Sequence, residues 1–233
     1  MKLGLNGLGR IGKLSLWNHV SRQFFSEIVV NLGRNVGGGL EDIAASIEKD
    51  STYGRLSMYL HGHKGGRVIE NLNEDKGSMT INGVPVTFLR KARNPKDIDW
   101  QANQVRLVVD TTGAFKDPTA DPNEGKGSVR GHLMAGAEKV MVSAPFKIQA
   151  KGLDMPEDAV TMVMGINDDE YDPAKHNVIS AASCTIRRPR RWLRRPLPAT
   201  ASSAPGGWPA PARTSTRKSR IACPGCSRWM PLS

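Results

Sequence analysis

Short apolar stretches alternate with longer amphipathic ones along the first 180 residues of the chain. The apolar stretches predict buried strands at 2–6, 27–31, 105–110, 139–143 and 160–166, with one more at Asn177-Val178-Ile179. The amphipathic stretches predict helices at 10–22, 40–50 and 129–137, and Ile11, Leu14 and Trp17 fall near one face of the first. Strands that alternate with helices predict a doubly wound, mainly parallel sheet of the α/β class.

Two further segments have turn chemistry. Residues 77–90 alternate apolar and polar positions on both sides of Asn82-Gly83, which predicts a β-hairpin. Residues 116–128 are rich in Pro, Gly, Asp and Lys, which predicts a surface loop.

The turn after the first strand carries the spacing Gly7-x-Gly9-x-x-Gly12. In a strand, turn, helix, strand unit of this length, the first glycine permits a tight exit from the strand. The second lets the backbone approach a pyrophosphate, and the third permits close helix packing. The amides and dipole at the helix start then favour an anion. The alternative is a glycine-rich turn of an α/β protein that binds no dinucleotide.

Charge is unevenly distributed. The chain has a net charge of +11, but residues 186–233 hold eleven of the 33 Lys and Arg and no acidic residue. The remaining 22 basic residues balance the 22 acidic ones, so the first 185 residues are formally neutral. Residues 186–233 also hold eight of the 15 Pro and three of the five Trp. We therefore predict two parts: a domain at 1–185 and a basic, disordered tail at 186–233.

The sequence also indicates the cell compartment. The start, MKLGLNGLGRIG, leads directly into a strand, so we expect no secretory signal, and no uncharged apolar run approaches the length of a membrane span. Three Cys in 233 residues make no disulfide framework, and Cys223 and Cys226 have no second pair of ligands nearby, so we predict no metal. A cytoplasmic protein without a membrane partner is expected.

The end of the second strand reads Asn31-Leu32-Gly33-Arg34. An acid here would accept hydrogen bonds from the adenosine ribose, and its absence removes the repulsion of a 2′-phosphate, with which Arg34 could pair. NADP is then tolerated or preferred. The alternative is that Arg34 is a solvated loop residue and NAD binds.

A run of small and hydroxyl residues, Ser180-Ala181-Ala182-Ser183-Cys184-Thr185, follows the last apolar strand. If Thr185 opens a helix, the helix dipole lowers the pKa of the Cys184 thiol and favours a nucleophilic thiolate. The alternative is a buried small apolar side chain.

Seven motifs in order resemble the glyceraldehyde-3-phosphate dehydrogenase family over residues 1–185. They are LNGLGRIG at 5–12, DSTYGRL at 50–56, SMTINGVPV at 78–86, RNPKDIDW at 93–100, DTTGAF at 110–115, KVMVSAP at 139–145 and SAASCT at 180–185. The resemblance implies a Rossmann-type NAD(P)-binding domain. It implies these cofactor-binding residues: Asn6, Gly7, Gly9, Arg10, Ile11, Gly12, Arg93, Thr112, Gly113 and Ser143. Arg34, the candidate contact to a 2′-phosphate, is a further cofactor-binding candidate. It implies substrate contacts at Ser183 and Thr185.

The resemblance also implies a mechanism. Cys184 attacks an aldehyde, hydride passes to the nicotinamide, and phosphate releases the thioester. The partners would be phosphate and a phosphorylated aldehyde, either glyceraldehyde 3-phosphate or erythrose 4-phosphate. The family supplies the general base as a His on its second domain. The five His of this chain, at 19, 61, 63, 132 and 176, lie in segments where the family has structural or exposed residues, so we assign no base.

Several departures from the family are visible. Leu32 replaces the usual acid, Ala181 stands where Asn is common, and loop 116–128 looks longer. After Thr185 no family motif is found and no His occurs, which we interpret as a reading-frame shift. We therefore expect this chain to be catalytically inactive and not to form the family's homotetramer.

Alternative functions remain for such a chain. Eleven basic residues and three Trp in the tail could contact nucleic acid, although a disordered stretch with no nucleic-acid partner is expected. The chain could also be a nucleotide-binding or RNA-binding remnant without catalysis, or a fragment without function.

Overall fold

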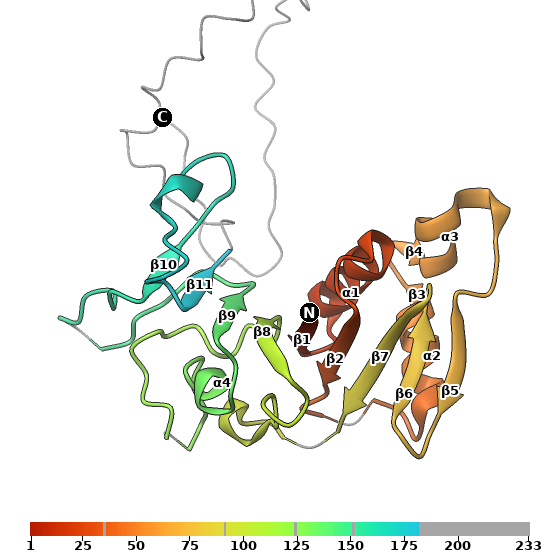
Figure 1. Cartoon of the computed structure of the whole chain (residues 1–233), viewed down its shortest axis with the longest axis horizontal. Coiled ribbons are helices and arrows are strands. Elements are labelled where there is room, and N and C mark those ends of the chain that lie inside the picture. Colours follow the sequence, from red (N-terminus) through yellow and green to blue (C-terminus); the bar gives the residue numbers. More distant parts are fainter. Residues whose placement is uncertain (35, 91, 124, 151, 182–233) are drawn as a thin grey trace, which may run out of the picture. The chain divides into compact units, whose positions relative to one another are not determined.

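The computed structural model describes residues 1–34, 36–90, 92–123, 125–150 and 152–181. Within these ranges one nine-stranded sheet has the order β10-β11-β9-β8-β1-β2-β7-β6-β5 (Figure 1). Its strands are β1 (Lys2–Asn6), β2 (Glu27–Asn31), β5 (Ile69–Asn73), β6 (Ser78–Ile81), β7 (Val84–Leu89), β8 (Val105–Asp110), β9 (Lys139–Val142), β10 (Ala159–Thr161) and β11 (Val178–Ser180). The α-helices are α1 (Arg10–Arg22), α2 (Leu40–Glu48), α3 (Leu56–His61) and α4 (Gly131–Met134). Strands β3 (Lys49–Asp50) and β4 (Gly54–Arg55) form a small separate pair.

The sheet is mainly parallel. Every neighbouring pair from β10 through to β7 is parallel, and only the β7-β6 and β6-β5 pairs of the described sheet are antiparallel. The predicted doubly wound α/β fold is confirmed. Edge strand β5 is irregular, since its register shifts between Glu70 and Asn73 and Asn71 has φ of 52°.

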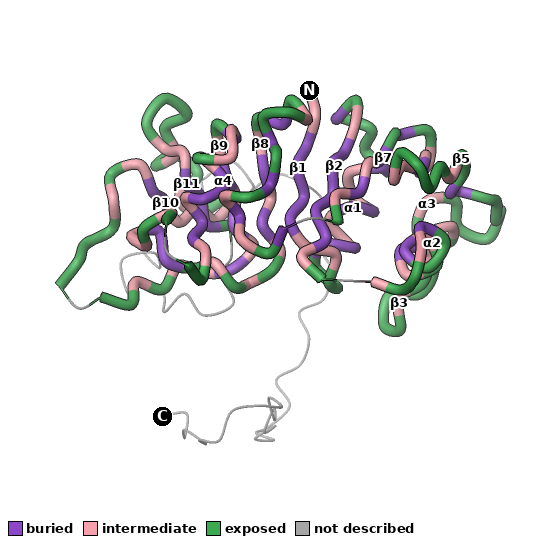
Figure 2. The backbone as a smooth tube through the Cα atoms, turned by 90° about the horizontal axis from the view of Figure 1, so that it is seen from below, coloured by how far each residue is buried: buried purple, intermediate pink, exposed green. Residues whose placement is uncertain are grey.

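Side chains of β2 alternate between two hydrophobic cores, one on each face of the sheet. Ile28 and Val30 pack in the core that α1 and α2 cover, together with Leu16 and Trp17 of α1. Val29 points to the other face, into the core that contains Trp100. Figure 2 shows the buried backbone concentrated in the central strands β8, β1 and β2. Apolar cover on both faces explains why these strands read as continuous apolar runs.

Four elements have the predicted bounds, namely β1, α1, β2 and β8. The hairpin prediction is also confirmed, because β6 and β7 meet at Asn82 and Gly83, whose φ angles of 50° and 80° suit a type I′ turn.

The helix predicted at 129–137 is wrong in extent. Only Gly131–Met134 is α-helical, and Gly136 has φ of 98°, which no continuing helix permits. The predicted strand at 160–166 is also too long. It ends at Thr161, and Gly165 with φ of 76° belongs to a turn.

Two predictions around the first two helices also need correction. The second helix ends at Glu48, because Lys49 and Asp50 pair with β4 instead of continuing it. Ile11 does not share the buried face of α1. Its side chain is 54% exposed, and the buried face is formed by Gly12, Lys13, Leu16, Trp17 and Val20.

Candidate functional site

A crevice for a ligand is expected where β1 lies between β2 and β8. Strand β1 is parallel to both neighbours, and the chain leaves β1 toward β2 through α1, whereas β8 lies on its other side (Figure 1). This change of winding direction separates the connections at the carboxyl ends of the strands, where open α/β sheets bind their ligands. The glycine turn follows β1 at this edge.

The three glycines of the turn lie in three different environments. Gly7 has φ of 95°, a left-handed conformation that glycine adopts without strain. A Cβ on Gly9 would meet no atom within 4 Å, so the backbone there borders open space. A Cβ on Gly12 would collide with the carbonyl oxygen of Gly7 and lie 2.7 Å from Thr111 Oγ1. These environments are compatible with the roles that the spacing predicts: a strand exit, a ligand approach and a close packing contact, in that order.

The N-terminus of α1 is free to bind an anion. Gly9 is its N-cap residue, and in this fully described helix no side chain caps the first turn and no acidic residue lies in it. The first intrahelical bond runs from Lys13 N to Gly9 O, which leaves the earlier amides available as donors. Amides and helix dipole together fit a pyrophosphate.

The DSTYGRL segment holds the start of α1 through Asp50. Its carboxylate accepts hydrogen bonds from the amides of Thr52 and Tyr53 at 2.9 and 3.1 Å, and Lys13 Nζ lies 3.3 Å from its Oδ2. The Thr52 and Tyr53 bonds, aided by Lys13, lower the pKa of Asp50. Arg10, mostly exposed, lies near the same turn, with Nη2 3.4 Å from Ser51 Oγ.

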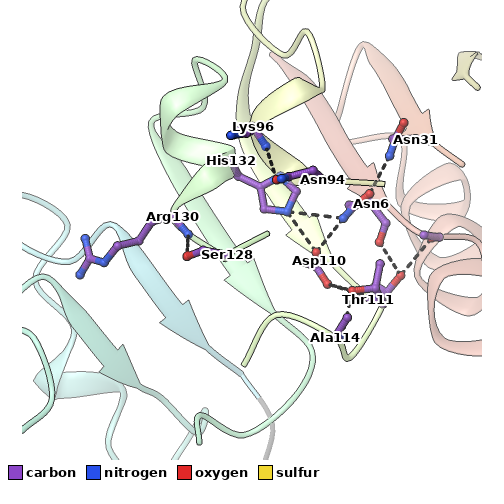
Figure 3. A network of polar contacts seen from close by, with 12 residues as sticks. Asn6, Asn31, Asn94, Lys96, Asp110, Thr111, Ala114, Ser128, Arg130 and His132 are labelled. Atoms are coloured by element: carbon purple, nitrogen blue, oxygen red, sulfur yellow. Dashed lines mark hydrogen bonds and ion pairs between the residues drawn. The ribbon is translucent and has the colours of Figure 1, made fainter. Parts of the chain in front are cut away.

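Polar side chains form a buried row at the ends of three adjacent strands (Figure 3). Asn6, Asn31 and Asp110 are the last residues of β1, β2 and β8, and each is at most 3% exposed. Asp110 Oδ2 accepts a bond from Asn6 Nδ2 at 2.7 Å and lies 3.0 Å from His132 Nε2. Burial alone would raise the pKa of Asp110, but the hydrogen bonds from His132, Thr112 and Asn6 outweigh it and lower the pKa.

The DTTGAF segment forms the turn after β8. Asp110 Oδ1 accepts bonds from the amide and hydroxyl of Thr112 at 2.9 and 2.7 Å, and Thr112 Oγ1 accepts one from the Ala114 amide at 3.2 Å. Gly113 has φ of 66°, and open space surrounds its Cβ position. Ser143 follows β9 at the same edge, and its amide donates to Asp110 O at 2.9 Å.

The end of β2 combines a buried Leu32 with exposed arginines. Leu32 is 6% exposed and packs in the core, so it presents no group at the expected position of the crevice. Arg34 is exposed, and Arg93, also exposed, donates from Nε to Gly33 O at 3.0 Å. The Arg93 side chain therefore lies against the turn that carries Arg34.

The substrate-binding and catalytic candidates Ser183, Cys184 and Thr185 lie outside the described residues, as does the tail at 186–233. The described chain reaches Ala181, one residue after β11. Strand β11 is parallel to β9, so its carboxyl end lies at the edge of the sheet that carries the glycine turn.

The sequence analysis assigned no individual role to three residues of this buried polar cluster: Asp110, His132 and Trp100, whose Nε1 donates to His132 Nδ1 at 3.0 Å. His132, for which the sequence allows a structural or an exposed position, is fully buried and contacts Asp110. A signal existed in the polar residues that end three apolar runs, GLN at 4–6, VVN at 29–31 and VVD at 108–110, since polar groups buried at strand ends need partners.

The sheet, its switch in winding direction and the glycine turn define a Rossmann-type dinucleotide-binding domain. Residues 1–118 match the family described as glyceraldehyde 3-phosphate dehydrogenase, NAD binding domain. The chain therefore belongs to this family, and its cofactor is NAD(P).

Individual proteins similar to this chain are named glyceraldehyde-3-phosphate dehydrogenase, like the family. Glyceraldehyde-3-phosphate dehydrogenase of Streptomyces coelicolor is 31% identical over 185 residues, which cover 79% of this chain and 45% of that protein. Glyceraldehyde-3-phosphate dehydrogenase 1 of Globodera rostochiensis is 35% identical over 184 residues, which cover 79% of this chain and 48% of that protein. The chain thus spans about half the length of the curated relatives it matches.

None of the helices in the described part of the chain is both long enough and apolar enough to cross a bilayer.

Proposed function

We propose that this chain binds NAD(P) with its pyrophosphate at the N-terminus of α1 and that its parent activity is the phosphorylating oxidation of glyceraldehyde 3-phosphate. The observation that carries the proposal is the glycine turn, with open space at Gly9 and uncapped amides at the start of α1. Asn6 ends β1 just before this turn, Gly7 lies in the turn, and Arg10, Ile11 and Gly12 form the first turn of α1 after it. Thr112, Gly113 and Ser143 would border the crevice on the side of β8 and β9.

Cys184 is the proposed nucleophile. Its thiolate would attack the aldehyde carbon and form a hemithioacetal, with Ser183 and Thr185 as substrate contacts. A bound nicotinamide supplies the hydride acceptor for the oxidation. Phosphate would then displace the thiolate from the thioester and give an acyl phosphate. The names of the reported relatives favour glyceraldehyde 3-phosphate over erythrose 4-phosphate as the aldehyde.

NADP is proposed as an accepted cofactor. Leu32 provides no carboxylate to repel a 2′-phosphate, and two exposed guanidinium groups, of Arg34 and Arg93, flank the same turn. We expect Arg34→Ala to weaken NADP binding about tenfold, because a charge-assisted hydrogen bond is lost, and to leave NAD binding within about twofold. Arg22→Ala, at the exposed far end of α1, is the control and should change neither affinity.

Calorimetric titration measures these affinities. An Arg34→Ala variant that loses affinity for both cofactors equally would contradict the 2′-phosphate contact, and a wild-type chain that binds NAD alone would remove the NADP proposal.

The 233-residue chain by itself is proposed to be inactive and not to form a homotetramer. Activity in this mechanism needs a general base, and residues 186–233 contain no His and no family motif. A rate measurement with glyceraldehyde 3-phosphate, phosphate and cofactor tests this, with erythrose 4-phosphate in parallel. Cofactor binding without turnover supports the proposal. Turnover would contradict the proposed inactivity of the chain, and failure to bind either cofactor would contradict the proposed cofactor site and activity together.

A second candidate function is RNA binding by the tail. It is favoured by one observation, the eleven basic residues and three Trp at 186–233 without an acidic residue. Salt-sensitive binding of single-stranded RNA by the full chain would support it.

The cytoplasmic location stays a prediction.

A further inference from the structure

A continuous chain of hydrogen bonds crosses the carboxyl edge of the sheet, and Figure 3 shows its central part, from Asn31 to His132. It begins at Ala92 O, just after β7, which accepts a bond from Asn31 Nδ2 at 3.0 Å. Asn31 Nδ2 also donates to Asn6 Oδ1 at 2.9 Å, and Asn6 Nδ2 donates to Asp110 at 2.7 Å. Beyond Asp110 the series continues to His132, whose Nε2 lies 3.0 Å from Asp110 Oδ2. It ends at Trp100, which donates from Nε1 to His132 Nδ1 at 3.0 Å. Four neighbouring strand ends are thereby connected.

All donors of this hydrogen-bond chain except one point toward Asp110, the exception being the bond from Asn31 Nδ2 to Ala92 O. An indole nitrogen only donates, so Trp100 requires an unprotonated Nδ1 on His132. The proton of the neutral ring is then on Nε2, where it faces Asp110 Oδ2. On the opposite side, Asn6 must turn its amide nitrogen to the carboxylate and its oxygen to Asn31. Each side chain in this series of hydrogen bonds therefore has one permitted orientation.

This arrangement has an energetic cost that stability alone does not explain. Asp110 and His132 are fully buried, and a buried ionised carboxylate is tolerated only when it is fully hydrogen-bonded. Among the described residues Asn31 Oδ1 is a buried acceptor with no partner, because its amide nitrogen serves both neighbours. Apolar side chains would cover the end of the sheet without these losses.

The hydrogen-bond chain is coupled to both the turn after β1 and the turn after β8. Asp110 Oδ1 holds the amide and hydroxyl of Thr112. Thr111 Oγ1 lies 3.0 Å from both Asn6 O and Gly7 O, and its amide donates to Asn6 O at 2.9 Å. A displaced Asp110 would therefore move the turn after β8 and, through Thr111, the start of the glycine turn.

We propose that Asp110 and His132 are positioning residues that hold these two turns in the geometry that receives the dinucleotide, and that Trp100 sets the tautomer of His132 for this role. The proposal rests on the proposed cofactor site. It adds that affinity for the cofactor depends on side chains that do not touch it.

The matched pair Trp100→Phe and Trp17→Phe tests the proposal in the full chain. Both indoles are at most 1% exposed and each donates one hydrogen bond, Trp17 to Ile47 O at 2.9 Å on the other face of the sheet. Both variants should lose similar stability in urea unfolding. Trp100→Phe should weaken NAD(P) binding about tenfold, as expected for a lost hydrogen bond to a charged network, and Trp17→Phe should leave it within about twofold. Equal effects on affinity would overturn the proposal.

Asp110→Asn provides a stronger test. The added amide hydrogens would oppose donors from Asn6 or Thr112, so we expect a loss of affinity greater than that of Trp100→Phe. A folded Asp110→Asn variant with wild-type affinity would overturn the proposal. Should this variant not fold, the tryptophan pair still decides.

Amide exchange separates this proposal from the cofactor assignment. If the wild-type chain binds neither NAD nor NADP, the proposed function fails. The positioning role is then supported if Trp100→Phe accelerates hydrogen exchange at the Thr112 and Gly113 amides at least about tenfold relative to Trp17→Phe. It is overturned if the two variants exchange alike at these amides. Nitrogen-15 spectra of His132 should show the Nε2-protonated tautomer in the wild type and a mixture in Trp100→Phe.

Discussion

Two alanine substitutions in the glycine turn should separate folding from cofactor binding. At Gly12, alanine normally favours a helix over glycine by about 1 kcal/mol. Here its Cβ would collide with Gly7 O and lie 2.7 Å from Thr111 Oγ1. Because a backbone carbonyl must move, overpacking should cost toward the upper end of about 1–3 kcal/mol and so exceed the gain in helix propensity. Gly12→Ala is therefore expected to lower the free energy of unfolding.

At Gly9 the balance is reversed. A Cβ meets no atom within 4 Å, and the backbone angles of φ −71° and ψ −169° are open to alanine. The poorer N-cap should cost less than about 1 kcal/mol of stability. The Cβ would instead occupy the space proposed for the pyrophosphate, and Gly9→Ala should weaken NAD(P) binding at least about tenfold.

Urea unfolding followed by circular dichroism measures the stabilities, and calorimetric titration measures the affinities. Gly66→Ala is the control, since an added Cβ there also meets no atom within 4 Å, away from the turn. The reasoning is refuted if Gly12→Ala stabilises the chain as an ordinary helix substitution would. It is also refuted if Gly9→Ala binds cofactor with wild-type affinity.

Two further predictions concern stability. Leu16→Ala, at a fully buried position of α1, should lower the free energy of unfolding by about 2–5 kcal/mol in urea titrations, and a loss below 1 kcal/mol would contradict the assigned core. The pKa of Asp158 is lowered chiefly by its hydrogen bonds from Arg130. The ion pair therefore stabilises the fold above the unfolded pKa of Asp158, near 4, and this contribution is lost as the pH falls through the lower pKa of the folded state. Asp158→Asn should therefore flatten the loss of stability between about pH 5 and 2, and an unchanged acid limb would argue against the pair.

Much of the fold was predictable because its signals are local. The apolar runs of β1, β2 and β8 are covered on both faces, and the I′ turn at Asn82 and Gly83 needs only those two residues. Strand β5 was not predicted, because its own residues are mostly polar and exposed and its pairing is set by β6. Helix α3 was not predicted either, since it has six residues and only Leu56 is buried.

The site divides in the same way. The glycine turn follows from spacing along the chain, and its local environments could be anticipated glycine by glycine. The contact between Asp110 and His132 joins residues 22 positions apart and depends on where α4 packs. The link from Asn6 to Asp110 spans 104 positions and exists only once β1 and β8 pair. Such contacts follow from sheet order, which no single segment encodes.

The two outermost strands of the described sheet resist extension of the sheet by another chain. Strand β5 has a register shift and a left-handed Asn71 in the middle, which interrupts the regular row of amides and carbonyls that an incoming strand would need. Strand β10 has three residues and offers too short a template. Fibril growth by edge-to-edge addition to the described sheet should therefore be slow.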